Sequence, residues 1–100
     1  VGGEMGFAIG AKLNAIAANH QVICITHLPQ VAVHGSTHFA VAKRVRGERT
    51  FTGIQLLDAD ARTEELARML GGRSPTQLTR DHAREMLATA KARTRRGTAG

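Results

Sequence analysis

Apolar residues recur at helical spacing near the start of the chain. Between residues 4 and 18 they occupy positions i, i+4, i+8 and i+11: Met5, Ile9, Leu13 and Ile16. This spacing predicts a helix with one apolar stripe along its length. The same segment carries small residues that would let the helix lie close to a sheet: Gly6, Gly10 and Ala17.

A short run of β-favouring residues follows this helix. Residues 22–25 read Val-Ile-Cys-Ile, a continuous apolar run that is typical of a buried parallel strand. Pro29 has no N–H to donate to a strand ladder, so the strand must end before it. Thr26, His27 and Leu28 are therefore predicted at the carboxyl end of a buried strand, which is the edge of an α/β sheet where ligands bind.

The middle of the chain has the pattern of a β-hairpin. Residues 38–45 alternate between two faces, and residues 50–57 are again rich in β-favouring side chains. The short segment between them contains Gly47, a residue typical of tight turns. We therefore predict two antiparallel strands joined by a turn near Gly47.

Two further helices are predicted to close the fold. Asp60 is placed to cap the first helix, which ends at the Gly-Gly pair of residues 71–72. Ser74 is the expected N-cap of the second helix, which starts at Pro75 and runs to about Ala92. The whole pattern predicts an α/β fold with the order helix, strand, β-hairpin and two helices.

Chain length and charge divide the chain into one folded part and a tail. The 100 residues make one domain at most, predicted over residues 1–92. Residues 93–100 lose the apolar periodicity and are predicted to be a basic, disordered tail. The net charge is +6, but the last ten residues carry four basic residues and no acid, which leaves ten basic against eight acidic residues before them. The surplus charge indicates a solvated or phosphate-contacting end more than a basic face across the fold.

Cysteine use and hydropathy indicate a cytoplasmic protein. The single cysteine, Cys24, has no partner for an internal disulfide and lies in an apolar run, which fits a reducing compartment. No apolar stretch approaches the ~20 residues that span a bilayer, and the first residues lack the pattern of a signal peptide. We therefore expect no membrane partner.

His27 is the residue best suited to chemistry. An imidazole at the end of a buried strand can donate a hydrogen bond to a phosphate oxygen or orient a water molecule. A histidine in such a place is also commonly a satisfied structural residue, so its position alone leaves both roles open.

Several stretches together carry a family resemblance. They are Val1-Gly2-Gly3, His-Gln-Val-Ile-Cys-Ile-Thr-His-Leu-Pro-Gln-Val-Ala over residues 20–32, Glu-Leu-Ala-Arg-Met-Leu-Gly-Gly over residues 65–72, and His82-Ala83 with Glu85-Met86-Leu87. With these stretches the chain resembles the C-terminal part of the RecN family of bacterial DNA-repair ATPases, an SMC-like branch of the ABC ATPases. The resemblance covers all but the tail and implies the C-terminal portion of an ABC/SMC-type P-loop ATPase head.

The resemblance implies roles for particular residues. His27 would be the switch (H-loop) histidine, a catalytic residue that contacts the γ-phosphate of ATP, and Thr26 would lie beside it in the nucleotide site. Val1, Gly2 and Gly3 would be the tail of the D-loop, at the interface with a second ATPase head of a homodimer. ATP and Mg²⁺ are the implied cofactors, and DNA at double-strand breaks is the implied partner of a nucleoid-associated protein.

Other motifs of such an ATPase are not found in the chain. The Walker A loop, the signature motif, the Walker B aspartate and the catalytic glutamate would all precede Val1. Phosphoryl transfer needs these groups acting together. We therefore expect a fragment that is inactive alone and that contributes the switch histidine to ATP hydrolysis in recombinational repair of DNA double-strand breaks.

Two other interpretations concern histidines and basic residues. Four histidines follow the spacing H-x6-H-x6-H-x3-H, which matches no zinc template, so no metal site is predicted. Basic residues flank the expected hairpin turn and are candidates for DNA-phosphate contacts, although a solvated edge explains them equally well: Lys43, Arg44, Arg46 and Arg49. The alternative function is a small, stably folded, basic nucleic-acid-binding module without nucleotide chemistry.

Overall fold

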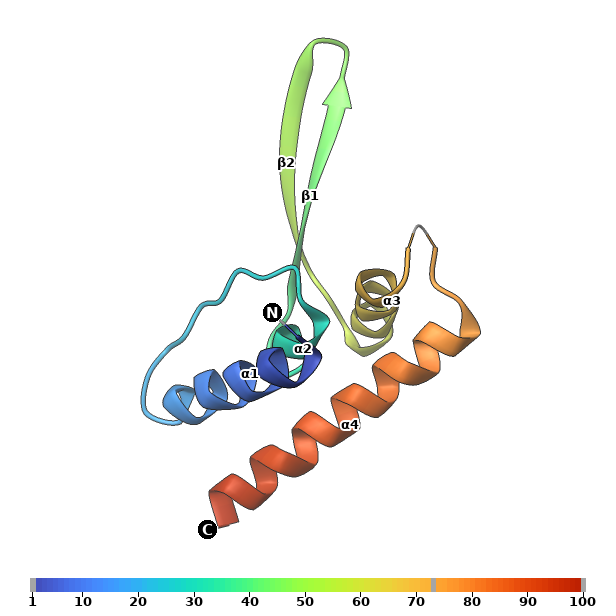
Figure 1. Cartoon of the computed structure of the whole chain (residues 1–100). Coiled ribbons are helices and arrows are strands. Elements are labelled where there is room, and N and C mark those ends of the chain that lie inside the picture. Colours follow the sequence, from blue (N-terminus) through green and yellow to red (C-terminus); the bar gives the residue numbers. More distant parts are fainter. Residues whose placement is uncertain (1, 73, 100) are drawn as a thin grey trace.

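Helices and one β-hairpin make up the structure (Figure 1). The computed structural model describes residues 2–72 and 74–99, with side chains for residues 2–72 and 74–94. The elements in chain order are α1 (Gly3–Ala17), α2 (Pro29–Ala32), β1 (Phe39–Arg46), β2 (Arg49–Leu56), α3 (Ala59–Leu70) and α4 (Gln77–Ala99). The mixture of helices and sheet confirms the predicted α/β class.

Helix α1 forms where its spacing predicted it, but it packs through its glycines. Gly6 and Gly10 are buried, and a Cβ built on Gly6 would lie 3.2 Å from the Cβ of Gln30 in α2. Most of the predicted apolar stripe is exposed: Met5, Ile9 and Ile16. The helix therefore lies against α2 and not against a sheet, because small residues allow the two backbones to approach closely.

The prediction of a buried strand at residues 22–25 is wrong. Residues 21–26 are extended but belong to no strand, and Cys24 is exposed. Ile23 is 84% exposed and Ile25 is 96% exposed. A buried parallel strand needs neighbouring strands that pair with its backbone and helices that cover its two faces. The one sheet among the described residues is the hairpin, whose two strands pair only with each other.

The chain turns into α2 immediately after this extended segment. Leu28 has extended dihedral angles, φ −98° and ψ 117°, and Pro29 occupies the first helical position. Proline suits that position because its missing N–H has no partner in a first turn. The helix is one turn long and buries Pro29 and Val31.

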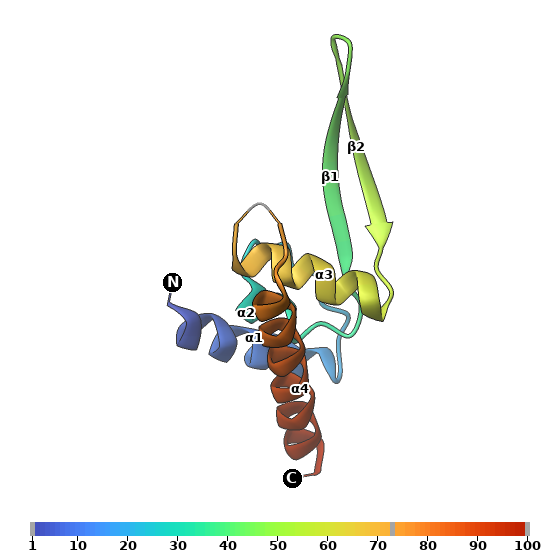
Figure 2. The same cartoon turned by 90° about the vertical axis from the view of Figure 1, so that its right-hand side faces the viewer.

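The predicted hairpin is confirmed, with Arg46 paired to Arg49 across its turn. Gly47 has φ +61°, the left-handed value that the first central residue of a type II′ turn requires and that glycine adopts without strain. Figures 1 and 2 show the hairpin extending away from the helices. Apolar residues that share one of its faces are consequently exposed: Phe39, Val41, Ile54 and Leu56.

The N-cap of helix α3 lies two residues before the predicted cap, Asp60. The N-cap is Asp58, whose Oδ1 accepts a hydrogen bond of 2.8 Å from the backbone N–H of Ala61. Asp60 lies inside the first turn, where a carboxylate interacts favourably with the helix dipole. The predicted end at Gly71 is confirmed, since Gly71 is the C-cap.

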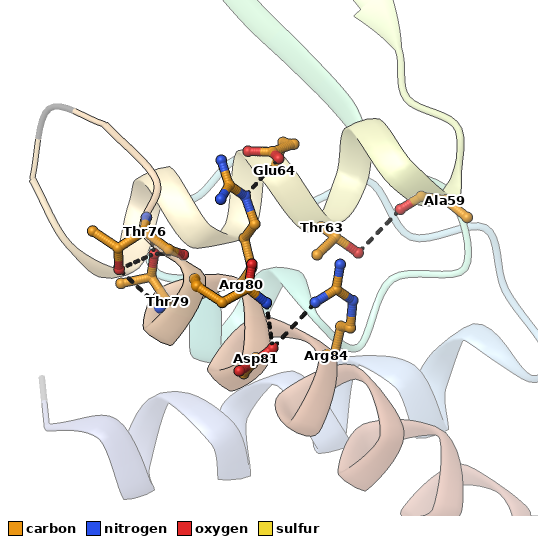
Figure 3. Close-up of polar contacts among 9 residues, drawn as sticks. Ala59, Thr63, Glu64, Thr76, Thr79, Arg80, Asp81 and Arg84 are labelled. Atoms are coloured by element: carbon orange, nitrogen blue, oxygen red, sulfur yellow. Dashed lines mark hydrogen bonds and ion pairs between the residues drawn. The ribbon is translucent and has the colours of Figure 1, made fainter.

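Helix α4 begins after Thr76 and not after the predicted cap Ser74 (Figure 3). The Thr76 hydroxyl accepts a hydrogen bond from the Thr79 N–H at 3.1 Å, and the Thr76 N–H donates to the Thr79 hydroxyl at 2.8 Å. This reciprocal pair is a capping box. The helix continues to Ala99, beyond the predicted end at Ala92, while Gly100 of the predicted tail lies outside the described residues.

The buried core lies among α2, α3 and α4. Its members are fully or nearly fully buried: Val33, Leu66, Ala67, Ala83 and Ala90. An ion pair of 2.7 Å between Glu64 and Arg80 joins α3 to α4 at the surface (Figure 3). The radius of gyration is 14.7 Å, larger than the ~13 Å of a compact domain of this length, because the hairpin extends away from this small core.

Candidate functional site: the turn around His27

His27 lies at the end of the extended segment, directly before α2. Its side chain is exposed, and within the described part of the chain it takes part in no hydrogen bond or ion pair. An unengaged imidazole at an exposed turn has both ring nitrogens free to bind a ligand. The imidazole is therefore accessible, but the sheet edge predicted around it is not found among the described residues.

Thr26, the second predicted nucleotide-site residue, shapes the turn itself. Its hydroxyl accepts a hydrogen bond of 3.0 Å from the backbone N–H of Leu28. A bond from a threonine hydroxyl to the N–H two residues on is a local turn motif. Thr26 thereby fixes the path of the chain on both sides of His27.

The structure brings the start of α1 close to this turn. Gly2 is the N-cap of α1, and a Cβ built on Gly3 would lie 3.6 Å from Nε2 of Gln30 in α2. Gln30 is three residues after His27 in the sequence. Of the predicted D-loop residues, Gly3 therefore adjoins α2, which follows the turn at residues 26–28, named here the switch turn after the role expected of His27. Gly2 has no such neighbour among the described residues, and Val1 lies outside them.

Arg62 is a site residue that the sequence analysis missed. It lies on α3, and its Nη2 donates hydrogen bonds to the backbone oxygens of Ala32 at 3.0 Å and Gly35 at 2.6 Å. These carbonyls belong to the last residue of α2 and to the loop that follows. The contacts join residues about 30 positions apart, so no local pattern in the sequence indicates them.

His34 lies beneath the turn, where α1, α2 and α4 meet. It is buried, its ring packs edge-on against Phe7 with centroids 4.3 Å apart, and Nε2 has no hydrogen-bond partner among the described residues. Its backbone oxygen accepts a bond of 2.8 Å from Nδ2 of Asn14. Burial, and then the charge of Arg93, lower the pKa of His34, while a hydrogen bond with the Phe7 backbone acts in the opposite sense. The ring is therefore neutral around pH 7.

A pocket of about 400 Å³ opens where the hairpin meets α3. Its polar lining includes Ser36, Thr37, His38 and Arg62. Burial, and then the positive charge of Arg62, lower the pKa of His38, whereas Glu65 raises it. In the described part of the chain, His38 Nδ1 and Arg62 Nε are buried and have no hydrogen-bond partner.

The basic residues of the hairpin lie apart from the switch turn (Figure 1). All four are exposed, but they divide between the two faces, because directly paired residues point to the same side. Arg44, Arg46 and Arg49 share one face with Phe51, whereas Lys43 lies on the other. The structure therefore separates Lys43 from the predicted group of four.

The described residues contain neither a metal-binding cluster nor a membrane-spanning helix. Over residues 2–72 and 74–99, no group of three or more His, Cys, Asp or Glu side chains is arranged to hold a metal ion. Among the same residues, no helix is both long and apolar enough to cross a membrane.

Several DNA repair proteins contain a segment that is similar to this chain. No model of a protein family matches it. The DNA repair protein RecN of Xylella fastidiosa (strain Temecula1) is 51% identical over 72 residues, which are 72% of this chain and 13% of that protein. The RecN proteins of Bacillus subtilis and Treponema pallidum are each 40% identical, over 90% and 100% of this chain and over 16% and 17% of their own lengths. The chain therefore spans about one sixth of the relatives that it matches.

Proposed function

We propose, because this chain matches a C-terminal segment of the RecN family of DNA repair proteins, that it is part of an ATPase head in which His27 contacts the γ-phosphate of ATP. The RecN relatives are DNA repair proteins. We also propose that the complete protein is a cytoplasmic, nucleoid-associated homodimer that uses ATP in the recombinational repair of double-strand breaks.

One observation carries the proposal: an uncovered apolar segment ends at His27. Ile23 and Ile25 are almost fully exposed, and burying side chains of this kind stabilises a fold by about 1.5–3 kcal/mol each. A continuous apolar run is what a parallel strand buried on both faces requires. In the complete head, neighbouring strands would pair with residues 22–25 and helices would cover the side chains on both faces. His27 would then lie at the carboxyl edge of the sheet, where ligands bind.

The other predicted site residues have supporting roles in this proposal. Thr26 holds the switch turn through its bond to Leu28 and lies beside the nucleotide. Val1, Gly2 and Gly3 contribute to the contact with a second head. ATP and Mg²⁺ would be held mainly by motifs outside this chain, and the bound metal would neutralise charge on the phosphates during transfer.

A chimaera tests the role of His27. This chain replaces the matching C-terminal segment of full-length Bacillus subtilis RecN, and single-turnover ATP hydrolysis is measured at saturating ATP. His27→Ala should lower the rate constant at least about tenfold, since one lost transition-state hydrogen bond commonly costs that much or more. ATP affinity should change little. His20→Ala, which removes an exposed histidine at the other end of the extended segment, should leave the rate unchanged, and an unchanged rate in His27→Ala would disprove the proposal.

A second candidate function, nucleic-acid binding through the hairpin, is supported by the arrangement of its arginines. Arg46 and Arg49 are directly opposed across the strands, and like charges in this position destabilise a sheet. Arg44 and the half-exposed ring of Phe51 oppose each other on the same face. Cations interleaved with an aromatic ring match the phosphates and bases of a nucleic-acid strand.

Matched sets of arginines test this second function in the 100-residue chain. The hairpin triple variant replaces Arg44, Arg46 and Arg49 with Gln; the control triple replaces arginines that pair with carboxylates: Arg68, Arg80 and Arg84. Both variants lose three charges. Only the hairpin variant should reduce the slope of log affinity against log salt, by roughly 2–3 for three phosphate contacts. Equal reductions in both variants would show that net charge alone drives binding.

A further inference from the structure

Arg62 holds the end of α2 from a neighbouring helix. A single guanidinium nitrogen of Arg62 donates to the carbonyls of Ala32, at 3.0 Å, and Gly35, at 2.6 Å. Carbonyls at a helix C-terminus have no partner within the helix, and a cation there also interacts favourably with the helix dipole. The N-cap Asp58 sets the start of α3 and thereby the position of Arg62 one turn later.

The surroundings of Arg62 differ from those of the surface arginines. Arg68, Arg80 and Arg84 each pair with a carboxylate. Arg62 is partly buried and has no ion pair among the described residues, and burial lowers its pKa. Burying a cation is costly unless polar groups compensate. The two carbonyls compensate at Nη2, while Nε has no hydrogen-bond partner among the described residues. The bonds at Nη2 join Arg62 to the end of α2.

Only a short stretch of the chain separates these carbonyls from His27. Helix α2 is four residues long and begins at Pro29, two residues after His27. Its far end is held by Arg62, and the turn before it is held by the Thr26 hydroxyl. Residues 21–26, on the other side of His27, belong to no strand or helix in this chain. The position of the imidazole therefore depends on how α2 is held.

We infer that Arg62 is a positioning residue for hydrolysis, which keeps α2 and the switch turn in the one arrangement that places His27 against the nucleotide. The inference rests on the proposed function of His27. Arg62 itself need not touch ATP, because it acts through the backbone of α2.

The test uses the same full-length chimaera and four variants: Arg62→Met, Arg62→Lys, His27→Ala and the double variant Arg62→Met/His27→Ala. Arg62→Met should lower single-turnover hydrolysis about tenfold, within the range that ångström-scale misplacement of a catalytic group costs, without changing ATP affinity. Arg62→Lys, which keeps a cation able to donate to both carbonyls, should lie between the wild type and Arg62→Met. Arg68→Met, a matched change on the same helix, should have the wild-type rate.

The double variant separates positioning from general stability. If Arg62 acts through His27, Arg62→Met should cause no further loss in the His27→Ala background. Hydrogen exchange without nucleotide should be faster in α2 of Arg62→Met. An equal loss in both backgrounds, or a wild-type rate in Arg62→Met, would overturn the inference while leaving the role of His27 intact. A wild-type rate in His27→Ala would overturn the proposed function and, with it, this inference. If Arg62→Met does not fold, Arg62→Lys in both backgrounds decides the question.

Discussion

The imidazole of His34 occupies the space that a side chain on Gly10 would need. A Cβ built on Gly10 would lie 3.0 Å from Cγ of His34 and closer still to Cδ2. Contacts at such distances between carbon atoms are strongly repulsive. Gly10 therefore allows α1 to lie directly on the residues that follow the switch turn.

Gly10→Ala should destabilise the contact between α1 and α2. Alanine favours a helix by about 1 kcal/mol over glycine, but overpacking against a buried ring typically costs 1–3 kcal/mol. We expect a net loss in the free energy of local opening, measured by native-state hydrogen exchange of α1 in the chimaera. The double variant Gly10→Ala/His34→Ala removes the clash and provides the control. A loss of equal size with and without the His34 ring would contradict the steric explanation.

The stability of the α1–α2 contact should fall as the pH is lowered from 7.5 to 5. His34, which packs against α1, has a pKa lowered by burial in the folded chain, whereas unfolded histidines have a pKa of about 6.5. Below about pH 6.5 the unfolded state therefore binds more protons than the folded state, which favours unfolding. The loss should level off below the folded pKa of His34.

Histidine variants assign this pH dependence. His34→Gln should remove part of it, while His20→Gln, a change at an exposed histidine, should leave it unaltered. The measurement is the free energy of local opening from hydrogen exchange at several pH values. If the His34→Gln and parent profiles coincide, His34 does not contribute.

The two possible caps of α4 can be compared directly. Thr76→Ala removes the bonds of the Thr76 hydroxyl to the Thr79 N–H and the Thr79 hydroxyl and should cost about 1 kcal/mol in the local opening of α4. Ser74→Ala should change it by less than roughly 0.5 kcal/mol, as for ordinary surface positions. Hydrogen exchange of the first turns of α4 in the chimaera gives both values. A larger effect at Ser74 would restore the cap expected from the sequence.

The 100-residue chain alone should unfold without a sharp thermal transition. Its exposed apolar residues lie both on the extended segment and on one hairpin face, including Ile23, Ile25, Phe39 and Ile54, and the buried core is small. Circular dichroism should show a broad melt, and the chain should bind a hydrophobic dye such as ANS. A cooperative melt without dye binding would instead support the independent nucleic-acid-binding module.

Short-range sequence patterns were enough to predict most of the helices and strands. Helix α1, the hairpin with its turn at Gly47, and the two closing helices follow from short-range periodicity and turn residues. The caps were each displaced by two residues, to Asp58 and Thr76, because neighbouring polar residues compete for the same N–H groups. Sequence patterns also indicated that the chain turns at Pro29, but they placed His27 at the end of a buried strand that does not form among the described residues.

Long-range packing decided what local patterns could not. The apolar stripe of α1 and the run at residues 22–25 were expected to be buried, but burial depends on which surface covers a residue, and the described part of this chain leaves most of these side chains exposed. Two sets of contacts join residues that are far apart in the sequence. Gly10 lies against the ring of His34, and Arg62 donates hydrogen bonds to the carbonyls of Ala32 and Gly35. The amino-acid sequence by itself determined where helices and turns form, since these depend on neighbouring residues. Only the tertiary structure decided which helix faces meet and which cation binds the carbonyls at the end of α2, because those depend on how distant segments pack.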